Sequence, residues 1–263
     1  MTVDLSGPRA KVQRAYEHRD ALEREIDAVL NGERHQIQLS AKLDPDTGYH
    51  VFRVAAMPDE WRLHVAVVLG DVVHCLRSAL DQIAWQLVLN HSGRPKNVKE
   101  KTLIDFPIKY RRKALTSTYA FGKVARGDRA ILDVAQPYKG TGNPNLRGLA
   151  LLQQLSNRDK HRVLSPILIS TMNFTLVGTE LEGSGFSIFS VDFTGVGKNL
   201  KIGAEVCRLV LPQPAKDEVD VAGYSTPNIR LPQRSDLSLM DGIDAMLTKV
   251  DSVLLAATNR YGT

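Results

Sequence analysis

One long apolar segment constrains this fold more than any other feature of the chain. Between Trp61 and Lys96 there is neither lysine nor glutamate, two residues that commonly cover exposed helix faces. A Pro-Asp-Glu sequence at 58–60 and a Ser-Gly pair at 92–93 mark the beginning and the end of a helix. We therefore expect a helix over about 58–90, buried at the centre of the fold.

The remaining segments predict an α+β fold. Apolar residues recur with helical spacing in some of them and alternate with polar residues in others. We expect further helices over 8–31, within 111–135, from 143 to about 160 and over 235–258, and strands over 37–43, 49–54 and 103–108, within 163–211 and near 226–232. The long central helix and its companion helices are expected to pack on an antiparallel, mainly C-terminal β-sheet.

The length and composition are compatible with one domain. The chain has 263 residues, of which 43% are hydrophobic, and this is enough for a sizeable core. No linker or internal repeat divides it, so we expect a single α+β domain over 1–263. Its parts are a helical and hairpin part at about 8–162, a β-rich part at about 163–232 and the C-terminal helix at about 235–258.

The sequence points to a cytoplasmic protein without a membrane partner. No secretory signal is visible at the N-terminus, and four charged or titratable residues interrupt the most hydrophobic stretch, 65–89. Cys75 and Cys207 both lie in apolar contexts, so we expect two reduced, buried cysteines rather than a disulfide.

The central helix carries a polar cluster that is not ordinary surface filler. His74, Arg77 and Asp81 are spaced i, i+3 and i+7, so they project from one face over two turns. Asp71 lies one turn before His74. Because lysine and glutamate are missing around them, we interpret these residues as a candidate site.

A second polar cluster lies at 157–162, at the end of the helix that begins at 143. The apolar stripe of that helix continues in phase onto Asp159 and then Arg162. A buried charge must be paired or hydrogen-bonded. We therefore expect Arg77 to face Asp159, and His161 or Arg162 to lie near Asp81.

Two interpretations of these two polar clusters remain open. In the first, the charges form a structural ion-pair network that fixes helix packing. In the second, His74 and His161 act as acid and base in a metal-independent ribonuclease-like site, because histidine transfers protons near neutral pH and arginine stabilises a phosphate. The candidate catalytic residues are His74, Arg77, Asp81, Asp159 and His161.

Positive charge is concentrated in one segment. Residues 94–129 contain eleven lysines and arginines against three acids, so this segment carries +8 and the rest of the chain carries −3. Such a patch is typical of a polyanion-binding protein, although a solvated surface gives the same pattern. The candidate polyanion-binding residues are Arg158, Arg162, Arg111, Arg112 and Lys113.

Cofactor and metal motifs give no competing interpretation. The sequence lacks Gly-x-Gly-x-x-Gly, Gly-x-Ser-x-Gly and His-Glu-x-x-His, and two separated cysteines do not make a zinc site. The glycines at 195 and 197 suit a hairpin turn better than a phosphate-binding loop. We expect no cofactor and no metal.

Three segments resemble those of a group of uncharacterised bacterial proteins of similar length. These are a "GD-xx-H-x-LRSALD" helix at 70–81, an "FPI" segment at 106–108 and a "DKHR" segment at 159–162. The resemblance covers roughly residues 60–165 and implies no activity, because none is assigned to that group. A looser likeness is to HEPN-type helical ribonucleases, which place arginine and histidine in an Arg-x4–6-His pattern. That pattern is not met here, since Arg158 and His161 are three apart and His74 precedes Arg77.

The sequence thus predicts one of two functions. The first is a nucleic-acid-processing protein with RNA or another polyanion as its partner. The second is a non-enzymatic binding or assembly protein, in which the polar clusters are structural and the N- and C-terminal helices mediate formation of a homodimer.

Overall fold

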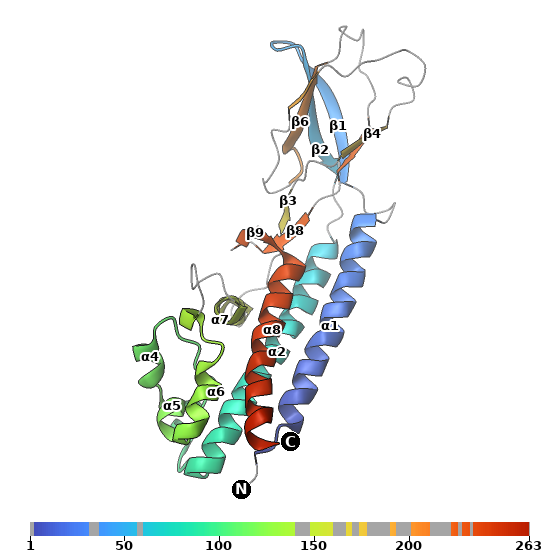
Figure 1. Ribbon diagram of the computed structural model, residues 1–263. Helices are drawn as coiled ribbons and strands as arrows, with labels where there is room; N and C mark the ends of the chain where they lie inside the picture. The colour runs from blue at the N-terminus through green and yellow to red at the C-terminus, as the bar shows by residue number, and fades with distance from the viewer. Residues whose placement is uncertain are drawn as a thin grey trace. The chain divides into compact units, whose positions relative to one another are not determined.

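The chain folds into two compact units (Figure 1). The computed structural model describes residues 3–31, 37–56, 60–139, 148–159, 167–169, 174–177, 190–192, 201–210, 222–225, 228–231 and 234–262. The helical unit comprises residues 1–22, 66–164 and 240–263, and the β unit comprises residues 23–65 and 165–239. The single domain expected from the sequence stays a prediction.

The helical unit is built around three long helices and a series of short ones. The long helices are α1 (Ser6–Asn31), α2 (Glu60–Ser92) and α8 (Leu239–Tyr261), with α1 and α2 extending past the unit boundary. Within this unit they lie side by side (Figure 1). The shorter elements are α3 (Val98–Thr102), α4 (Arg112–Thr116), α5 (Tyr119–Lys123), η2 (Arg126–Asp128), α6 (Arg129–Asp133), η3 (Pro137–Lys139) and α7 (Gly148–Asp159).

Helix α2 is the buried central helix that the sequence predicts. Leu69, Leu76, Leu80, Ile83 and Leu87 all have an exposed fraction of 0%. Together with Val72, which is also 0% exposed, these residues recur every three to four positions, which places them on one side of the helix. The expected buried centre is therefore confirmed.

The hydropathy of α2 also meets the length and composition criteria for a membrane span. Residues 63–92 are the one such helix in the part of the chain that the structure describes. Of its most apolar window, 56% is buried inside the structure, and a buried core helix meets the same criteria.

The β unit contains two antiparallel sheets. The larger has the strand order β4-β7-β1-β2-β6-β5 and the smaller the order β3-β8-β9. The strands are β1 (Ile37–Asp44), β2 (Tyr49–Ala56), β3 (Ile167–Ile169), β4 (Phe174–Val177), β5 (Ser190–Asp192), β6 (Glu205–Val210), β7 (Ala222–Ser225), β8 (Asn228–Leu231) and β9 (Arg234–Ser238). The α+β class is thereby confirmed.

The predicted hairpin at 37–54 forms the middle of the larger sheet. Strands β1 and β2 pair antiparallel, and Asp44 is opposite Tyr49 at the turn end of the hairpin. In the turn, Gly48 has a φ of +70°, a conformation that favours glycine. The Asp44 carboxylate accepts hydrogen bonds from the Asp46 N–H at 3.1 Å and the Thr47 hydroxyl at 2.7 Å. An Asp side chain that bonds its own turn is a common way to fix a hairpin loop.

Helix α8 is tied to the rest of the helical unit by carboxylates. The Tyr16 hydroxyl donates to Asp251, linking α1 to α8. Asp128 has an exposed fraction of 1%, and it accepts from the Tyr261 hydroxyl at 2.5 Å and from Arg260 Nε at 3.3 Å. The middle and the C-terminal end of α8 are therefore held by directional polar contacts as well as by apolar packing.

Replacing Gly148 tests the close packing of α7 on α8. A Cβ atom at this position would overlap the backbone carbonyl of Ala245, lying 2.6 Å from its carbon, so the two helices would have to separate. We expect Gly148→Ala to lower the free energy of unfolding by about 2 kcal/mol or more, measured by urea denaturation. The control Gly122→Ala, where no atom lies within 4 Å of the new Cβ, should leave stability unchanged or slightly raised. Equal stability of the two variants would contradict this packing.

The tyrosine–carboxylate contacts of α8 predict a loss of stability at high pH. The hydrogen bond to Asp251 raises the pKa of Tyr16 to about 12, and burial with the bond to Asp128 raises the pKa of Tyr261 to about 12. Because these pKa values lie above the ordinary value of 10.0, the contribution is fully present below pH 10 and is lost as the pH rises towards 12. Urea unfolding at a series of pH values should show this decline.

The variant Tyr261→Phe separates this effect from general alkaline unfolding. It removes one of the tyrosine hydroxyls whose pKa is raised, so the decline between about pH 10 and 12 should become shallower. Tyr110→Phe is the matched control, because the Tyr110 hydroxyl bonds to no carboxylate in the described structure. A decline that is equally steep in all three proteins would argue against the assignment.

Candidate functional site

Arg77 of α2 lies at the centre of a polar network that joins three parts of the helical unit. Its Nε donates to Asp81 at 3.2 Å, and one terminal nitrogen donates to Gln153 Oε1 of α7 at 3.2 Å. The other terminal nitrogen donates to the carbonyl of Phe106 at 2.9 Å and lies 3.3 Å from Asp105. All three guanidinium nitrogens of Arg77 are therefore engaged, and the side chain is 12% exposed.

Asp81 completes the contact on the same helix face. One of its oxygens accepts the backbone N–H of Phe106 at 2.8 Å and lies 2.9 Å from Arg77. Burial raises the pKa of the Asp81 carboxyl above its ordinary value, and the charge of Arg77 and the Phe106 N–H oppose that rise. The i, i+4 pair of Arg77 and Asp81 thus binds both the N–H and the C=O of a single residue.

Gln136 holds the continuation of the same segment. Its amide nitrogen donates to the carbonyls of Pro107 at 2.5 Å and Leu132 at 2.7 Å, and its oxygen accepts the Lys109 N–H at 2.8 Å. Gln136 is 2% exposed. Together, Arg77, Asp81 and Gln136 provide the backbone of residues 105–109 with hydrogen bonds, and we call this arrangement the clamp.

The clamp explains why the predicted strand at 103–108 is wrong. Ile104, Phe106 and Ile108 are all buried, so the segment shows the alternation that is typical of a strand. However, residues 104–109 are not in a strand, and their backbone groups pair with side chains instead. The alternation predicted the burial correctly and the hydrogen-bond partners incorrectly.

The expected pairing of Arg77 with Asp159 is also wrong. Gln153, six residues before Asp159 on α7, is the residue that reaches Arg77. Asp159 instead lies against Gly70, where a Cβ atom would be 3.1 Å from its Oδ1. Helical phase correctly predicted that α7 faces α2, but it did not give the position of one helix along the other.

The remaining candidate catalytic residues are not brought together in the described structure. His74 is exposed and makes no hydrogen bond or ion pair with the described residues. His161 and Arg162 lie outside the described residues. Arg158 lies in the last turn of α7, and its buried Nε has no hydrogen-bond partner among the described residues. Of the predicted catalytic set, the structure therefore joins Arg77 and Asp81.

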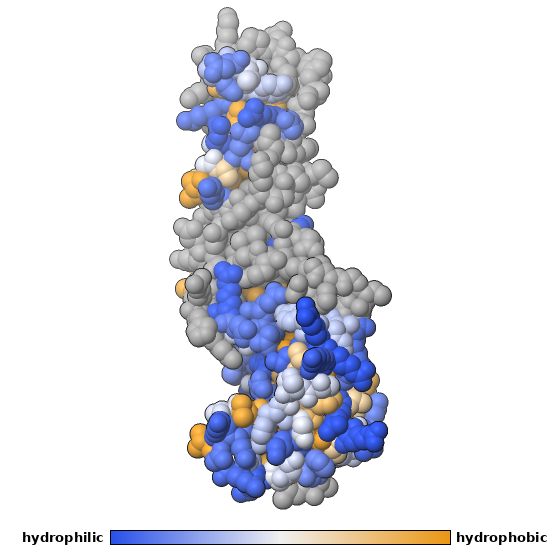
Figure 2. All heavy atoms as spheres, turned by 90° about the vertical axis from the view of Figure 1, so that its left-hand side faces the viewer, coloured by the Kyte–Doolittle hydropathy of each residue, from blue (hydrophilic) through white to orange (hydrophobic). Residues whose placement is uncertain are grey.

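The basic segment forms an exposed surface of unpaired charge. Figure 2 looks onto the side of the helical unit that carries α4, α5 and α6, and hydrophilic side chains cover much of it. Within the described part of the chain, eight cations of this segment are exposed and form no ion pair. We call them the basic surface: Arg94, Lys96, Lys99, Lys101, Arg111, Arg112, Lys113 and Arg126.

The three acids of the same segment do not neutralise these cations. Glu100 accepts the Lys96 backbone N–H at 2.8 Å, so it caps a turn rather than pairing with a lysine side chain. Asp105 pairs with Arg77 at 3.3 Å, and Asp128 is buried beneath Arg260. Since Arg77 and Arg260 lie outside residues 94–129, the positive charge of the segment remains available.

Aromatic side chains lie among the cations. Tyr110 is 37% exposed and directly precedes Arg111. The Lys123 ammonium lies 5.4 Å from the centre of the Tyr119 ring, and the Arg129 guanidinium lies 5.1 Å from that of Phe121. Tyr110 was not among the residues predicted from the sequence, although its position beside a run of three cations was a usable signal.

The described residues contain no cluster of three or more histidine, cysteine, aspartate or glutamate side chains that could hold a metal ion. The two cysteines, Cys75 and Cys207, are free and buried. Comparison with protein-family models, with curated proteins and with solved structures finds no match to this chain.

Removing the cation at the centre of the clamp tests whether it is structural. Arg77→Gln leaves the partly buried Asp81 carboxylate without its counter-charge and releases the Phe106 carbonyl. We expect the free energy of unfolding, measured in urea, to fall by about 2 kcal/mol. The control Arg112→Gln removes an exposed arginine and should change stability little. Wild-type stability of Arg77→Gln would contradict the structural role.

Proposed function

We propose that this protein binds nucleic acid, RNA in the first instance, through the basic surface, and that it does so without catalysis. The observation that carries this proposal is the imbalance described above: eight exposed cations are unpaired, while the three acids among them are engaged elsewhere. Cations clustered on one segment create a positive potential that attracts a polyanion. Because these cations form no ion pair, they are free to contact phosphates.

The aromatic residue within the basic surface favours a single-stranded partner. Proteins that bind single strands combine cations that contact the backbone with aromatic rings on which bases stack. Tyr110 and the adjacent Arg111, Arg112 and Lys113 supply both kinds of group within four consecutive residues. These residues are therefore the centre of the proposed contact.

The clamp supports a non-catalytic function. For Arg77 to hold a phosphate, it would have to leave Asp81 without its counter-charge and the Phe106 carbonyl without its donor, in a partly buried place. The ribonuclease hypothesis, with His74 and His161 as acid and base, stays a competing prediction. A cytoplasmic location and the relationship to the bacterial group that the sequence resembles belong to the same proposal.

The dependence of binding on salt tests the basic surface. Fluorescence anisotropy with a labelled single-stranded RNA should give an affinity whose logarithm falls linearly with the logarithm of the salt concentration. The triple variant Arg111→Gln/Arg112→Gln/Lys113→Gln should bind more weakly. Its slope should be smaller by up to about 2, since each lost phosphate contact on a single strand removes about 0.7.

A matched control carries the same loss of charge elsewhere. Arg24, Lys42 and Lys201 are exposed cations of the β unit that form no ion pair within the described residues. The variant Arg24→Gln/Lys42→Gln/Lys201→Gln should keep the wild-type affinity and slope. Equal weakening of both triple variants would show that net charge, and not the basic surface, causes binding. Binding to anionic lipid vesicles without binding to RNA would overturn the proposal.

The same samples distinguish binding from cleavage. RNA incubated with the wild-type protein in excess EDTA is expected to stay intact, because Arg77, the cation of the predicted catalytic set, is already held by Asp81 and the Phe106 carbonyl. Cleavage that is lost in a folded His74→Ala variant would support the ribonuclease hypothesis and contradict the non-catalytic part of the proposal.

A further inference from the structure

The exposed cations of the basic surface fall into two main groups with a gap between them. The α3 group consists of Lys96, Lys99 and Lys101, and the α4 group consists of Arg111, Arg112 and Lys113. None of the eight cations of the basic surface falls within residues 102–110, where Lys109 is less exposed. A polyanion that contacts both groups therefore has to cross this stretch.

The α3 group lies near the C-terminal end of α2. The hydroxyl of Ser92, the last residue of α2, donates to the carbonyl of Lys123 at 2.7 Å. The Lys123 ammonium lies 5.4 Å from the centre of the Tyr119 ring. Desolvation and the nearby carboxylate of Glu100, a residue of α3, raise the pKa of the Tyr119 hydroxyl. These contacts place the end of α2, α5 and α3 next to one another.

The segment that leads to the α4 group runs back along α2. Phe106 is bonded to Arg77 and Asp81, and Asp81 lies eleven positions before Ser92. At a rise of about 1.5 Å per residue, Phe106 is therefore held about 16 Å from the end of α2 along the helix axis. The α4 group begins five residues after Phe106, and α4 lies farther than α5 from this end of α2 (Figure 1). The two groups are thus separated along α2 by a distance on the order of 16 Å.

The stretch between the two groups is fixed by the fold. The clamp binds the backbone of residues 105–109, and Ile104, Phe106 and Ile108 are buried. Asp105, the acid of this stretch, lies 3.3 Å from Arg77. The gap in the basic surface therefore has a set length and presents no exposed cation to a polyanion.

Each group has a tyrosine ring beside it. Tyr110, which is 37% exposed, directly precedes Arg111 of the α4 group. Tyr119 lies next to Glu100 of α3, and the Lys123 ammonium lies over its ring. Proteins that bind single strands combine cations for the backbone with aromatic rings for the bases. Each group therefore has the parts of a small contact site of its own.

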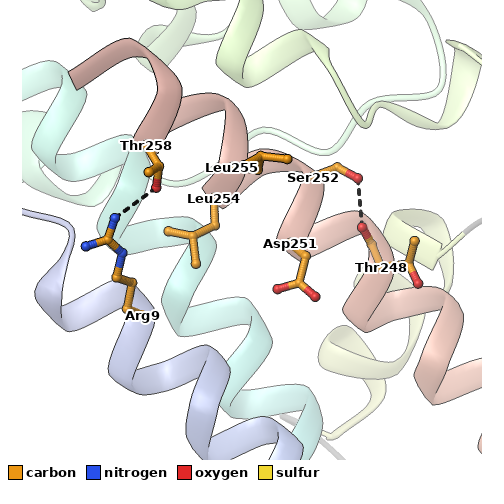
Figure 3. Close-up of a pocket in the computed structure, with 7 residues that line it drawn as sticks. All are labelled: Arg9, Thr248, Asp251, Ser252, Leu254, Leu255 and Thr258. Atoms are coloured by element: carbon orange, nitrogen blue, oxygen red, sulfur yellow. Dashed lines mark hydrogen bonds between the residues drawn. The ribbon is translucent and has the colours of Figure 1, made fainter. Parts of the chain in front are cut away.

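The hollow beside α8 and α1 offers no comparable contact for a phosphate (Figure 3). It has a volume of about 550 Å³, and Arg9 is the one cation among its lining residues. The Arg9 guanidinium donates to the Thr258 hydroxyl at 3.1 Å, and Asp251 supplies a carboxylate to the same hollow. The cations that can hold a strand are therefore those of the basic surface.

We infer that the basic surface is a bipartite site, in which one single strand of RNA contacts the α3 group and the α4 group at the same time. A strand stacked as in a duplex advances about 3.4 Å per nucleotide, so about five nucleotides cross the gap. With the nucleotides that contact each group, the partner is a single strand of at least about eight nucleotides. The inference rests on the proposed function and adds the length and the path of the strand.

The dependence of affinity on strand length tests this arrangement. Fluorescence anisotropy at low salt compares labelled oligouridylates of about three and about twelve nucleotides. The longer strand should bind the wild-type protein at least about 100-fold more tightly, because its second contact is intramolecular, whereas a choice among binding registers alone gives about tenfold. In Lys96→Gln/Lys99→Gln/Lys101→Gln and in Arg111→Gln/Arg112→Gln/Lys113→Gln, this ratio should fall to about tenfold. The control variant Arg24→Gln/Lys42→Gln/Lys201→Gln should keep the wild-type ratio.

A second probe distinguishes two contact sites from one continuous track. It carries three uridines at each end, joined by an uncharged poly(ethylene glycol) spacer in place of the central nucleotides. Because no exposed cation faces the gap, this probe should bind the wild-type protein at least about tenfold more tightly than three uridines alone. Either triple variant of the basic surface should remove this gain. Circular dichroism confirms that the variants are folded.

The outcomes separate this inference from the proposed function. A spacer probe that binds no better than three uridines would overturn the bipartite site. So would an α3-group variant that keeps the wild-type length ratio while the α4-group variant weakens binding, and that result would leave the proposed function intact. A protein that binds neither oligouridylate at low salt would refute the proposed function and this inference together.

Discussion

The rest of the helical unit depends on how Arg77 and Asp81 bind the backbone of residues 105–109. An extended segment that joins no sheet must find partners for its buried N–H and C=O groups, because leaving them unpaired costs free energy. Helix α2 supplies two of these partners, and Gln136 supplies the others. Placing a carboxylate there costs desolvation, which raises the pKa of Asp81. Because Arg77 also reaches Gln153, the same interaction sets the position of α7.

The clamp also determines which charges of the helical unit reach solvent. The three buried residues Ile104, Phe106 and Ile108 fix the middle of the basic segment against the core. The cations on both sides of them, from α3 to α4, must then lie outside. Asp105 pairs with Arg77, so one acid of the segment is engaged by a cation outside it. The structural network and the exposed basic surface are thus parts of one arrangement.

Whether a feature of this fold could be predicted from the sequence depends on what the underlying residue pattern reports. The central helix and the β1–β2 hairpin were predictable, because an apolar period and a turn sequence depend on local geometry. Residues 103–108 were misassigned because alternating burial is the same for a sheet strand and for a segment held by side chains. The predicted pairing of Arg77 with Asp159 was wrong because helical phase gives the direction in which a side chain projects from its helix. It does not give the position of that helix along the helix beside it. Gln136 and Gln153 were overlooked because uncharged amides are common on surfaces, and only their burial and contacts show their role.

Helix α8 is held both by apolar packing and by polar contacts to other elements of the helical unit. Val250 and Val253 on its inner face have exposed fractions of 0%. Tyr16 of α1 bonds to Asp251 in the middle of the helix, and Tyr261 at its C-terminal end bonds to Asp128. Apolar burial has no preferred direction, whereas a hydrogen bond to a carboxylate fixes the position of its donor. The two carboxylates therefore set the position of α8 along α1 and against the segment at 126–128, which apolar packing alone leaves free.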